Sequence, residues 1–329
     1  MIIDFHTHIF PDKIAERTIG ALSSSSSSKP HTNGKETGLI EAMVPSGVTL
    51  SVNLPVVTKP AQIESVIRFG TELNEKYSEK VKNILSAKSE ESGSTLSSKG
   101  DAFKSALTAN NDERSSPLYS KSDESSSPLS SNNKENSSPI SPAILSFAGI
   151  HPEDDQAEEH LELIKKQGFR GIKIHPDYQG TFFDDEKYVR ILRLAKELDL
   201  ITVTHAGVDG AFLGQPIKCT PSRVLRVLDK LGGYEKLVLA HLGGGKMEKE
   251  VIENLAGENV YFDTAYLLTL VAKADISAIL ERHSIDKILF ATDSPWSEAQ
   301  RDLAVISSLG LSKENEEKIL FKNALSLLA

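Results

Sequence analysis

Short apolar segments alternate with amphipathic segments along most of the chain. Residues 2–8 form the first apolar segment, and residues 48–54 form the second. After each of them come apolar residues three and four positions apart, which is the spacing of one face of a helix. The pattern predicts eight strands, each followed by helix, beginning near residues 2, 48, 144, 171, 200, 237, 260 and 287.

The predicted strands are continuously apolar, not alternately apolar and polar. Such strands are typical of a parallel sheet covered on both faces. An open, doubly wound sheet would need a glycine-rich phosphate loop after its first strand, but that position holds His6, Thr7 and His8. The sequence therefore predicts an α/β fold of the (β/α)₈ TIM-barrel type.

A serine-rich segment interrupts this pattern between the second helix of the series and the third strand. Residues 86–142 hold 19 serines and few large apolar side chains, with Ser-Ser-Pro recurring every eleven residues. Such a segment cannot bury enough surface to offset the entropy lost on ordering. We predict a low-complexity, disordered insertion at 86–142 within one barrel domain formed by residues 1–85 and 143–329.

Two helix ends can also be predicted. A helix opened by Pro11 is expected to end near Leu22, because the serine run at 23–28 is typical of a flexible loop. The helix that begins at Pro60 has apolar residues at helical spacing and is expected to reach about Tyr77.

Composition narrows the classes of function and location. The formal net charge of −9 argues against a nucleic-acid partner or an anionic membrane surface. Cys219 is the only cysteine, which excludes a disulfide framework and a thiolate zinc site. No apolar run has the length of a membrane span, and no signal peptide precedes the first strand. These features predict a soluble, cytoplasmic protein with a small-molecule substrate.

Histidines gather where the predicted strands end, which is where barrels of this type place their active sites. Six of the nine histidines and one aspartate lie there: His6, His8, His151, His175, His205, His241 and Asp293. His31, His160 and His283 lie in predicted loops or helices, and we expect no functional role for them. Imidazole and carboxylate groups without thiolate favour Zn²⁺, with Mn²⁺, Fe²⁺, Co²⁺ or Ni²⁺ as alternatives.

The motifs at these strand ends resemble those of the amidohydrolase superfamily of metal-dependent hydrolases. The resemblance is to its amidohydrolase-related branch, which includes enzymes similar to aminocarboxymuconate-semialdehyde decarboxylase. It covers nearly everything outside residues 86–142. It rests on Asp4-Phe5-His6-Thr7-His8, Gly171-Ile172-Lys173-Ile174-His175-Pro176, Thr204-His205-Ala206-Gly207, Ala240-His241-Leu242-Gly243-Gly244 and Ala291-Thr292-Asp293-Ser294-Pro295-Trp296.

The resemblance implies a role for each matching residue. His6 and His8 match the family's pair of metal ligands on the first strand, and His205 matches the ligand on the fifth. Asp293 matches the aspartate of the eighth strand, which touches the metal and handles protons. His241 matches the histidine of the sixth strand, which activates water or polarises the substrate. Asp293 and His241 are therefore the expected catalytic residues.

The fourth strand leaves the number of metal ions open. Binuclear members of the superfamily carry a carboxylated lysine or a glutamate there, and Lys173 lies in this strand. We favour an ammonium at Lys173 that neutralises a substrate carboxylate or the acids of the site, because its surrounding segment resembles the branch that binds one ion. His175 and His151 are each followed by proline and are expected to contact substrate at the rim.

The resemblance implies a hydrolase that uses a metal-bound hydroxide to cleave a C–N or C–O bond of a small, carboxylated substrate. A decarboxylase with the same ligands is the alternative. A TatD-like nuclease ranks lower because this chain lacks that family's glutamate on the fourth strand. A non-catalytic scaffold also ranks lower because the ligand set is intact. The resemblance further implies a homodimer, since barrels of this branch often form dimers.

Overall fold

Parallel strands form the centre of the computed structural model, which describes residues 1–86 and 141–329. Three strands pair in the order β1 (Ile3–Thr7), β2 (Leu50–Asn53) and β3 (Ala143–Ser146). The other six also pair in sequence order: β4 (Ala148–Gly149), β5 (Gly171–Ile174), β6 (Ile201–Thr204), β7 (Leu237–Leu239), β8 (Tyr261–Asp263) and β9 (Ile288–Leu289).

Two junctions join these strands into a ring. Only Phe147 separates β3 from β4, so these two strands together take one position of the barrel. The other junction joins β1 to the segment of β9. There the amide of Phe5 donates to the carbonyl oxygen of Phe290 at 2.9 Å, and the amide of Asp293 donates to the carbonyl oxygen of His6 at 2.8 Å. The predicted (β/α)₈ barrel is confirmed.

Close packing between strands depends on small residues at particular points. All residues of β5 and β6 are buried. A Cβ at Gly171 would lie 2.5 Å from the carbonyl oxygen of Ile201 and equally close to the Phe147 ring. A side chain at this position would therefore push β5 away from β6, and glycine keeps the two strands in register.

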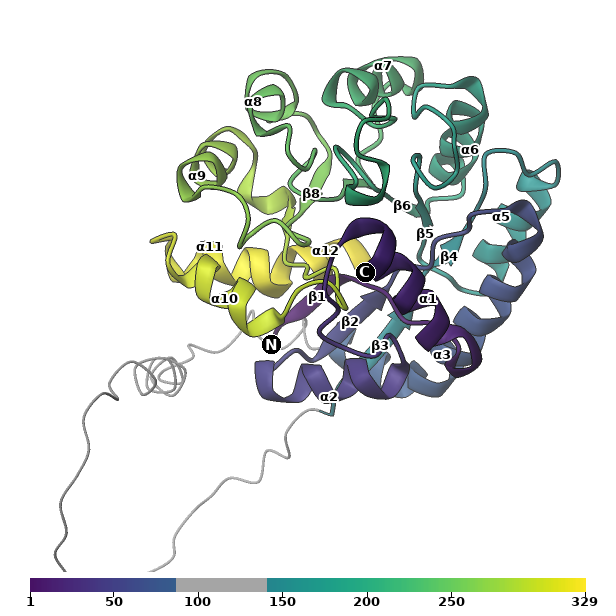
Figure 1. The fold of residues 1–329 in the computed structure, drawn as a ribbon, viewed down its shortest axis with the longest axis horizontal. Helices are drawn as coiled ribbons and strands as arrows, with labels where there is room; N and C mark the ends of the chain where they lie inside the picture. The colour runs from purple at the N-terminus through teal and green to yellow at the C-terminus, as the bar shows by residue number, and fades with distance from the viewer. Residues whose placement is uncertain (87–140) are drawn as a thin grey trace, which may run out of the picture. The chain divides into compact units, whose positions relative to one another are not determined.

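Helices surround the ring of strands (Figure 1). The longer ones are α2 (Glu36–Ser46), α3 (Ile63–Ser86), α5 (Ala157–Lys166), α6 (Glu186–Glu197), α7 (Pro221–Leu231), α9 (Lys273–Arg282), α10 (Ala299–Ser307) and α12 (Asn323–Leu328). The shorter segments are α8 (Glu248–Glu250), α11 (Lys313–Glu317), η1 (Pro60–Gln62), η3 (Gly210–Phe212), η4 (Val251–Leu255), η5 (Ile285–Lys287) and η6 (Lys318–Lys322).

The first helix, α1 (Asp12–Ser26), runs past its predicted end, so a flexible loop was the wrong interpretation for the first four serines of the run at 23–28. The hydroxyls of Ser24 and Ser26 donate to backbone carbonyl oxygens four residues earlier, at 2.8 and 2.9 Å. These bonds satisfy the serines within the helix. The helix ends at Ser27, whose φ of 56° is left-handed.

Other predicted boundaries shift as well. α3 continues past Tyr77 to Ser86 because the buried Val81 and Ile84 extend its apolar face. The helix predicted from Leu267 begins later, with α9, because the buried Leu267 lies in a turn. Of the insertion predicted at 86–142, only residues 86, 141 and 142 are described; its Ser-Ser-Pro repeats lie outside the described residues. Within the described ranges, no helix has the length and apolar character needed to cross a membrane.

Candidate metal centre

The ends of β1 and β9 bring three ligand atoms together. His6 lies in β1, His8 follows that strand, and Asp293 follows β9. The Nε2 atoms of His6 and His8 are 3.2 Å apart. Asp293 Oδ1 lies 3.4 Å from Nε2 of His6 and 3.0 Å from Nε2 of His8. We call these three residues the ligand triad.

Hydrogen bonds decide which nitrogen of each imidazole faces the triad. His6 Nδ1 lies 2.8 Å from Asp263 Oδ2, and His8 Nδ1 lies 2.8 Å from the carbonyl oxygen of Leu54. Carboxylate and carbonyl oxygens accept hydrogen bonds, so both Nδ1 atoms carry the proton and both Nε2 atoms present a lone pair. Two lone pairs and a carboxylate oxygen this close together repel one another unless a cation lies among them.

The separations within the triad match those around a metal ion. Ligand atoms in a four-coordinate site with bonds of about 2.0–2.1 Å lie roughly 3.3–3.4 Å apart. The observed separations are 3.2, 3.4 and 3.0 Å. Two imidazoles and a carboxylate are ligands for divalent transition metals. The triad could therefore hold one divalent ion.

Burial and neighbouring charges keep the triad in the protonation state that binds metal. Burial lowers the pKa of His6 well below its ordinary value, and the ammonium of Lys173 lowers it further. Burial alone would raise the pKa of Asp293, but the neighbouring imidazoles of His6 and His8 hold it below its ordinary value. At neutral pH the triad therefore presents a neutral His6 and an ionised Asp293, the forms that bind metal.

The backbone at the mouth of the barrel is strained. His241 and Asp293 adopt left-handed conformations, with φ of 60° and 64°. This conformation costs a residue other than glycine roughly 1–2 kcal/mol. Backbone hydrogen bonds at both positions help to hold it, from His241 to Asp263 Oδ1 at 2.9 Å and from Asp293 to the carbonyl oxygen of His6 at 2.8 Å. Strain of this kind is concentrated at functional sites.

Asp263, the last residue of β8, is a site residue that the sequence interpretation missed. It is fully buried, and burial raises its pKa. Its Oδ2 accepts from His6, and its Oδ1 accepts from the backbone amides of His241 and Ala265 at 2.9 and 3.1 Å. Asp263 thus positions both a metal ligand and a catalytic candidate. The available signal was an acidic residue at the end of the seventh predicted strand.

Lys173 lies in β5 and reaches the triad. Its Nζ lies 3.1 Å from His6 Nε2, and the residue is almost fully buried. Burial lowers the pKa of Lys173 to about 8, against the opposing effect of Asp263 and Asp293. The side chain is therefore an ammonium at neutral pH and donates to the lone pair of His6.

His241 and His205 lie beside the triad and bond to each other. His241 Nδ1 donates to the carbonyl oxygen of Ala265 at 2.9 Å, so its Nε2 accepts from His205 Nδ1, also at 2.9 Å. The rings of His6 and His241 are centred 5.6 Å apart. Nε2 of His205 faces Asp177 at 3.9 Å, and the ligand atoms of His205 do not group with the triad. Its role as a fourth ligand stays a prediction.

Of the two rim histidines, only His175 lies with the other candidates. Its ring stacks on that of His205, with centres 4.2 Å apart and an angle of 11° between the planes. His151 Nδ1 instead accepts from the backbone amide of Glu153 at 3.1 Å. No hydrogen bond or ring contact among the described residues joins His151 to the triad.

The three remaining histidines have partners elsewhere. His31 lies 3.4 Å from a carboxylate oxygen of Glu298. His160 Nδ1 lies 2.8 Å from a carboxylate oxygen of Asp154. His283 is buried and donates from Nε2 to a backbone carbonyl oxygen at 3.0 Å.

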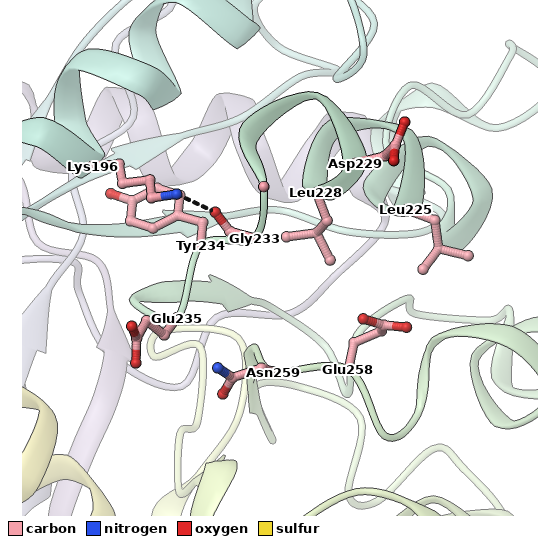
Figure 2. Close-up of a pocket in the computed structure, with 10 residues that line it drawn as sticks. Lys196, Leu225, Leu228, Asp229, Gly233, Tyr234, Glu235, Glu258 and Asn259 are labelled. Carbon is pink, nitrogen blue, oxygen red and sulfur yellow. Dashed lines mark hydrogen bonds between the residues drawn. The ribbon is translucent and has the colours of Figure 1, made fainter.

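A hollow of about 410 Å³ lies at the opposite end of the strands (Figure 2). Tyr234 and Glu235, which precede β7, line it together with Glu258 and Asn259, which precede β8. None of the candidate metal ligands lines this hollow. Cavity size therefore does not locate the chemistry, which lies where the strands end.

Solved structures share this fold over nearly the whole chain. A 2,6-dihydroxybenzoate decarboxylase from Rhizobium matches with a TM-score of 0.59 and 14% identity, covering 99% of this chain and 98% of the other. A dihydroxybenzoic acid decarboxylase from Polaromonas sp. JS666, with bound manganese, matches with a TM-score of 0.58 and 16% identity, covering 99% and 96%. A 5-carboxyvanillate decarboxylase from Sphingomonas paucimobilis matches with a TM-score of 0.55 and 13% identity, covering 100% and 98%.

A comparison with curated protein sequences gave no match. The family model described as amidohydrolase matches residues 141–329, which is more than half of the chain. That match includes β3 to β9 and therefore four of the five strand-end motifs. The chain belongs to the amidohydrolase family of metal-dependent enzymes.

Proposed function

We propose that the ligand triad holds a divalent ion with which the protein hydrolyses a C–N or C–O bond of a small, carboxylated substrate. The observation that carries this proposal is the convergence of two imidazole Nε2 atoms and a carboxylate oxygen within 3.0–3.4 Å of one another. Zn²⁺ is our first candidate because its four-coordinate sites have these separations. Mn²⁺ is the second, supported by the manganese in the Polaromonas structure.

A bound divalent ion supplies a Lewis acid that lowers the pKa of water to about 7 and polarises the bond to be cleaved. The side chains supply the proton transfers. Asp293 is ionised and buried at the triad, so it can accept a proton from water and return it to the leaving group. His241 presents an acceptor at Nε2, because its Nδ1 donates to Ala265. That Nε2 accepts from His205 Nδ1 at 2.9 Å, so His241 can receive a proton or orient water once this bond is broken.

Lys173 supports a carboxylated substrate. It contributes a buried positive charge next to His6. An ammonium in such surroundings binds a carboxylate more strongly than one in water, because the effective dielectric constant is lower. Among the rim candidates, His175 lies with the catalytic side chains and is the better candidate for a substrate contact, whereas His151 has no described contact with them.

Decarboxylation is the second candidate, favoured by the three decarboxylases named above as structural neighbours. In this reaction the bond between a carbon and the carboxylate breaks, carbon dioxide leaves, and a proton takes its place on that carbon. Because Asp293 is ionised, it would first have to take a proton from water and then deliver it to that carbon, whereas in hydrolysis it passes the proton from water to the leaving group. The same residues therefore serve both reactions.

One experiment tests both reactions. Protein reconstituted with Zn²⁺ or Mn²⁺ is incubated in ¹⁸O-labelled water with carboxylated amides and esters, and separately with hydroxybenzoates. Label in the non-volatile product supports hydrolysis, while carbon dioxide release without such label supports decarboxylation. An Asp293→Asn variant should lose either activity, and the matched Asp154→Asn variant should keep it. Full turnover by metal-stripped protein would overturn both candidates.

Location and assembly remain proposals based on the sequence. The single cysteine, Cys219, is buried and free, which is compatible with the proposed cytoplasmic location. The family resemblance supports a homodimer. Light scattering on the eluting protein would show whether its mass is twice that of one chain.

A further inference from the structure

The connection between β1 and α2 carries the extra helix α1 across the mouth of the barrel. At its base, the amide of Phe10 donates to the carbonyl oxygen of Gly34 at 2.8 Å. With β3 and β4 counted as one position, β6 is the fifth of the eight positions and lies opposite β1. The far end of α1 meets the segment that follows β6, where the carbonyl oxygen of Ser26 would lie 3.3 Å from a Cβ built on Gly210. α1 therefore reaches from one side of the ring to the other.

Two hydrogen bonds add to this contact at the far end of α1. The Ser28 hydroxyl lies 3.2 Å from the hydroxyl of Tyr266, in the segment that follows β8. Ser25 forms a hydrogen bond with Tyr178, in the segment that follows β5. The serine run at 23–28 thus touches three of the segments in which the strands end. Figure 1 shows α1, in dark purple, crossing in front of the strands.

The metal centre beneath α1 is almost closed to solvent. His6, His241 and Asp293 are each at most 9% exposed. Tyr178, which bonds to α1, also packs edge-on against the ring of His175, with centres 4.7 Å apart. A substrate must come into direct contact with such side chains to react. Some part of the mouth must therefore move to admit it.

α1 is weakly attached to the barrel. Of its fifteen residues, two are buried, Ala15 and Ile19, and neither belongs to the hydrophobic core formed by the described residues. By contrast, α6 buries five of its twelve residues, and all five belong to that core. Segments with few buried apolar contacts open at a low cost in free energy. α1 can therefore leave the mouth while the barrel stays folded.

We propose that α1 is a lid over the metal centre, held shut by its serine end and displaced to admit substrate. The paired backbone of Phe10 and Gly34 at its base provides the pivot. Closure excludes water, which strengthens the attraction between the Lys173 ammonium and a substrate carboxylate. The proposal rests on the proposed function in one respect, because the ion that the lid covers is the one held by the triad.

A reversible disulfide can lock the lid. The Cβ atoms of disulfide-bonded cysteines lie about 3.5–4.5 Å apart. Cβ of Ser26 lies 3.6 Å from a Cβ built on Gly210. The Ser26→Cys/Gly210→Cys variant should therefore form the bond on oxidation and hold α1 shut. Cys219 is the only cysteine of the natural chain, and because it is buried it should not compete.

The rate at which a chelator removes the metal measures access to the centre. The full-length variant is loaded with Co²⁺ and mixed with a chelator, before and after reduction with dithiothreitol. The oxidised form should lose Co²⁺ slower than the reduced form by about tenfold or more, because the chelator reaches the ion through the open state. Turnover should show the same reversible loss. The matched control, Ser26→Cys alone, should respond to neither treatment.

Equal rates of metal loss in the oxidised and reduced forms would overturn the lid, and so would thiols that fail to pair on oxidation. Hydrogen exchange gives a second test that needs no metal. In wild type, the amides of α1 should exchange faster than those of α6, and the disulfide should slow them. Equal protection of the two helices would also overturn the lid. Wild type that binds no Co²⁺ would overturn the proposed function alone, so the two proposals fail separately.

Discussion

An Asp263→Asn substitution should convert His6 Nε2 from an acceptor into a donor. The new side chain can keep its carbonyl oxygen where it accepts from the amides of His241 and Ala265. Its amide nitrogen then takes the place of Oδ2, 2.8 Å from His6 Nδ1. Because an amide nitrogen only donates, Nδ1 must accept, and the proton moves to Nε2, which faces Asp293.

The expected loss of metal affinity follows from the role of Asp263 as the hydrogen-bond partner of His6. Removing the group that orients a histidine ligand costs about 10–100-fold in metal affinity. This equals about 1.4–2.7 kcal/mol, since each tenfold change is about 1.4 kcal/mol. Both residues are buried, with His6 1% and Asp263 0% exposed, so water cannot take over the lost role.

Calorimetric titration with Zn²⁺ measures this loss. It should be done on metal-depleted, full-length protein. Asp154→Asn is the matched control, because Asp154 is also buried and lies the same 2.8 Å from a histidine Nδ1, that of His160. Its Kd for Zn²⁺ should not change. An unchanged Kd in Asp263→Asn would refute the tautomer argument.

Three further substitutions test local parts of the account. Gly207→Ala should destabilise the fold by more than the roughly 1–2 kcal/mol that a left-handed residue costs, because its Cβ would lie 2.2 Å from the amide nitrogen of Gly245. Gly214 is also left-handed but has open space around it, so Gly214→Ala should show only the backbone cost. Equal shifts in Tm for the two variants would contradict this reasoning. Burial lowers the pKa of His283 to about 4 from its ordinary value of 6.5. Its neutral form therefore stabilises the fold above pH 6.5, and this contribution, about 3 kcal/mol at most, is lost as the pH falls toward 4. The gap in urea-unfolding free energy between wild type and His283→Gln should narrow from pH 7 to pH 4, and a constant gap would disprove the assignment. Lys173→Met should raise KM for a carboxylated substrate by about 10–100-fold with a smaller change in kcat, and a defect confined to kcat in steady-state assays would argue against the carboxylate contact.

The barrel was predictable because burial of the strands on both faces leaves a signal in every strand. The strand ends were predictable for the same reason, so the sequence also located His6, His8 and Asp293. The orientation of His205 was not predictable. It depends on a hydrogen bond to His241, which is itself held by Ala265 on a loop far along the chain. No local pattern encodes such a chain of contacts.

Two features show where sequence patterns mislead. The serine run at 23–28 has the composition of a loop, yet its first four residues are helical, because hydroxyls such as that of Ser24 bond back to the preceding turn. Asp263 ends a strand of only three residues and carries no motif of its own. Its role comes from its buried contact with His6, which is distant in the sequence.

Binding of a divalent ion by the ligand triad can be measured directly. The most direct measurement is the metal content of reconstituted, dialysed protein by elemental analysis, comparing wild type with His8→Ala/Asp293→Asn. His31→Ala/Glu298→Gln is the matched control, since that pair is also a histidine and a carboxylate, 3.4 Å apart, outside the triad. The account predicts one equivalent less in the triad variant and no loss in the control. Equal metal content in all three proteins would contradict it.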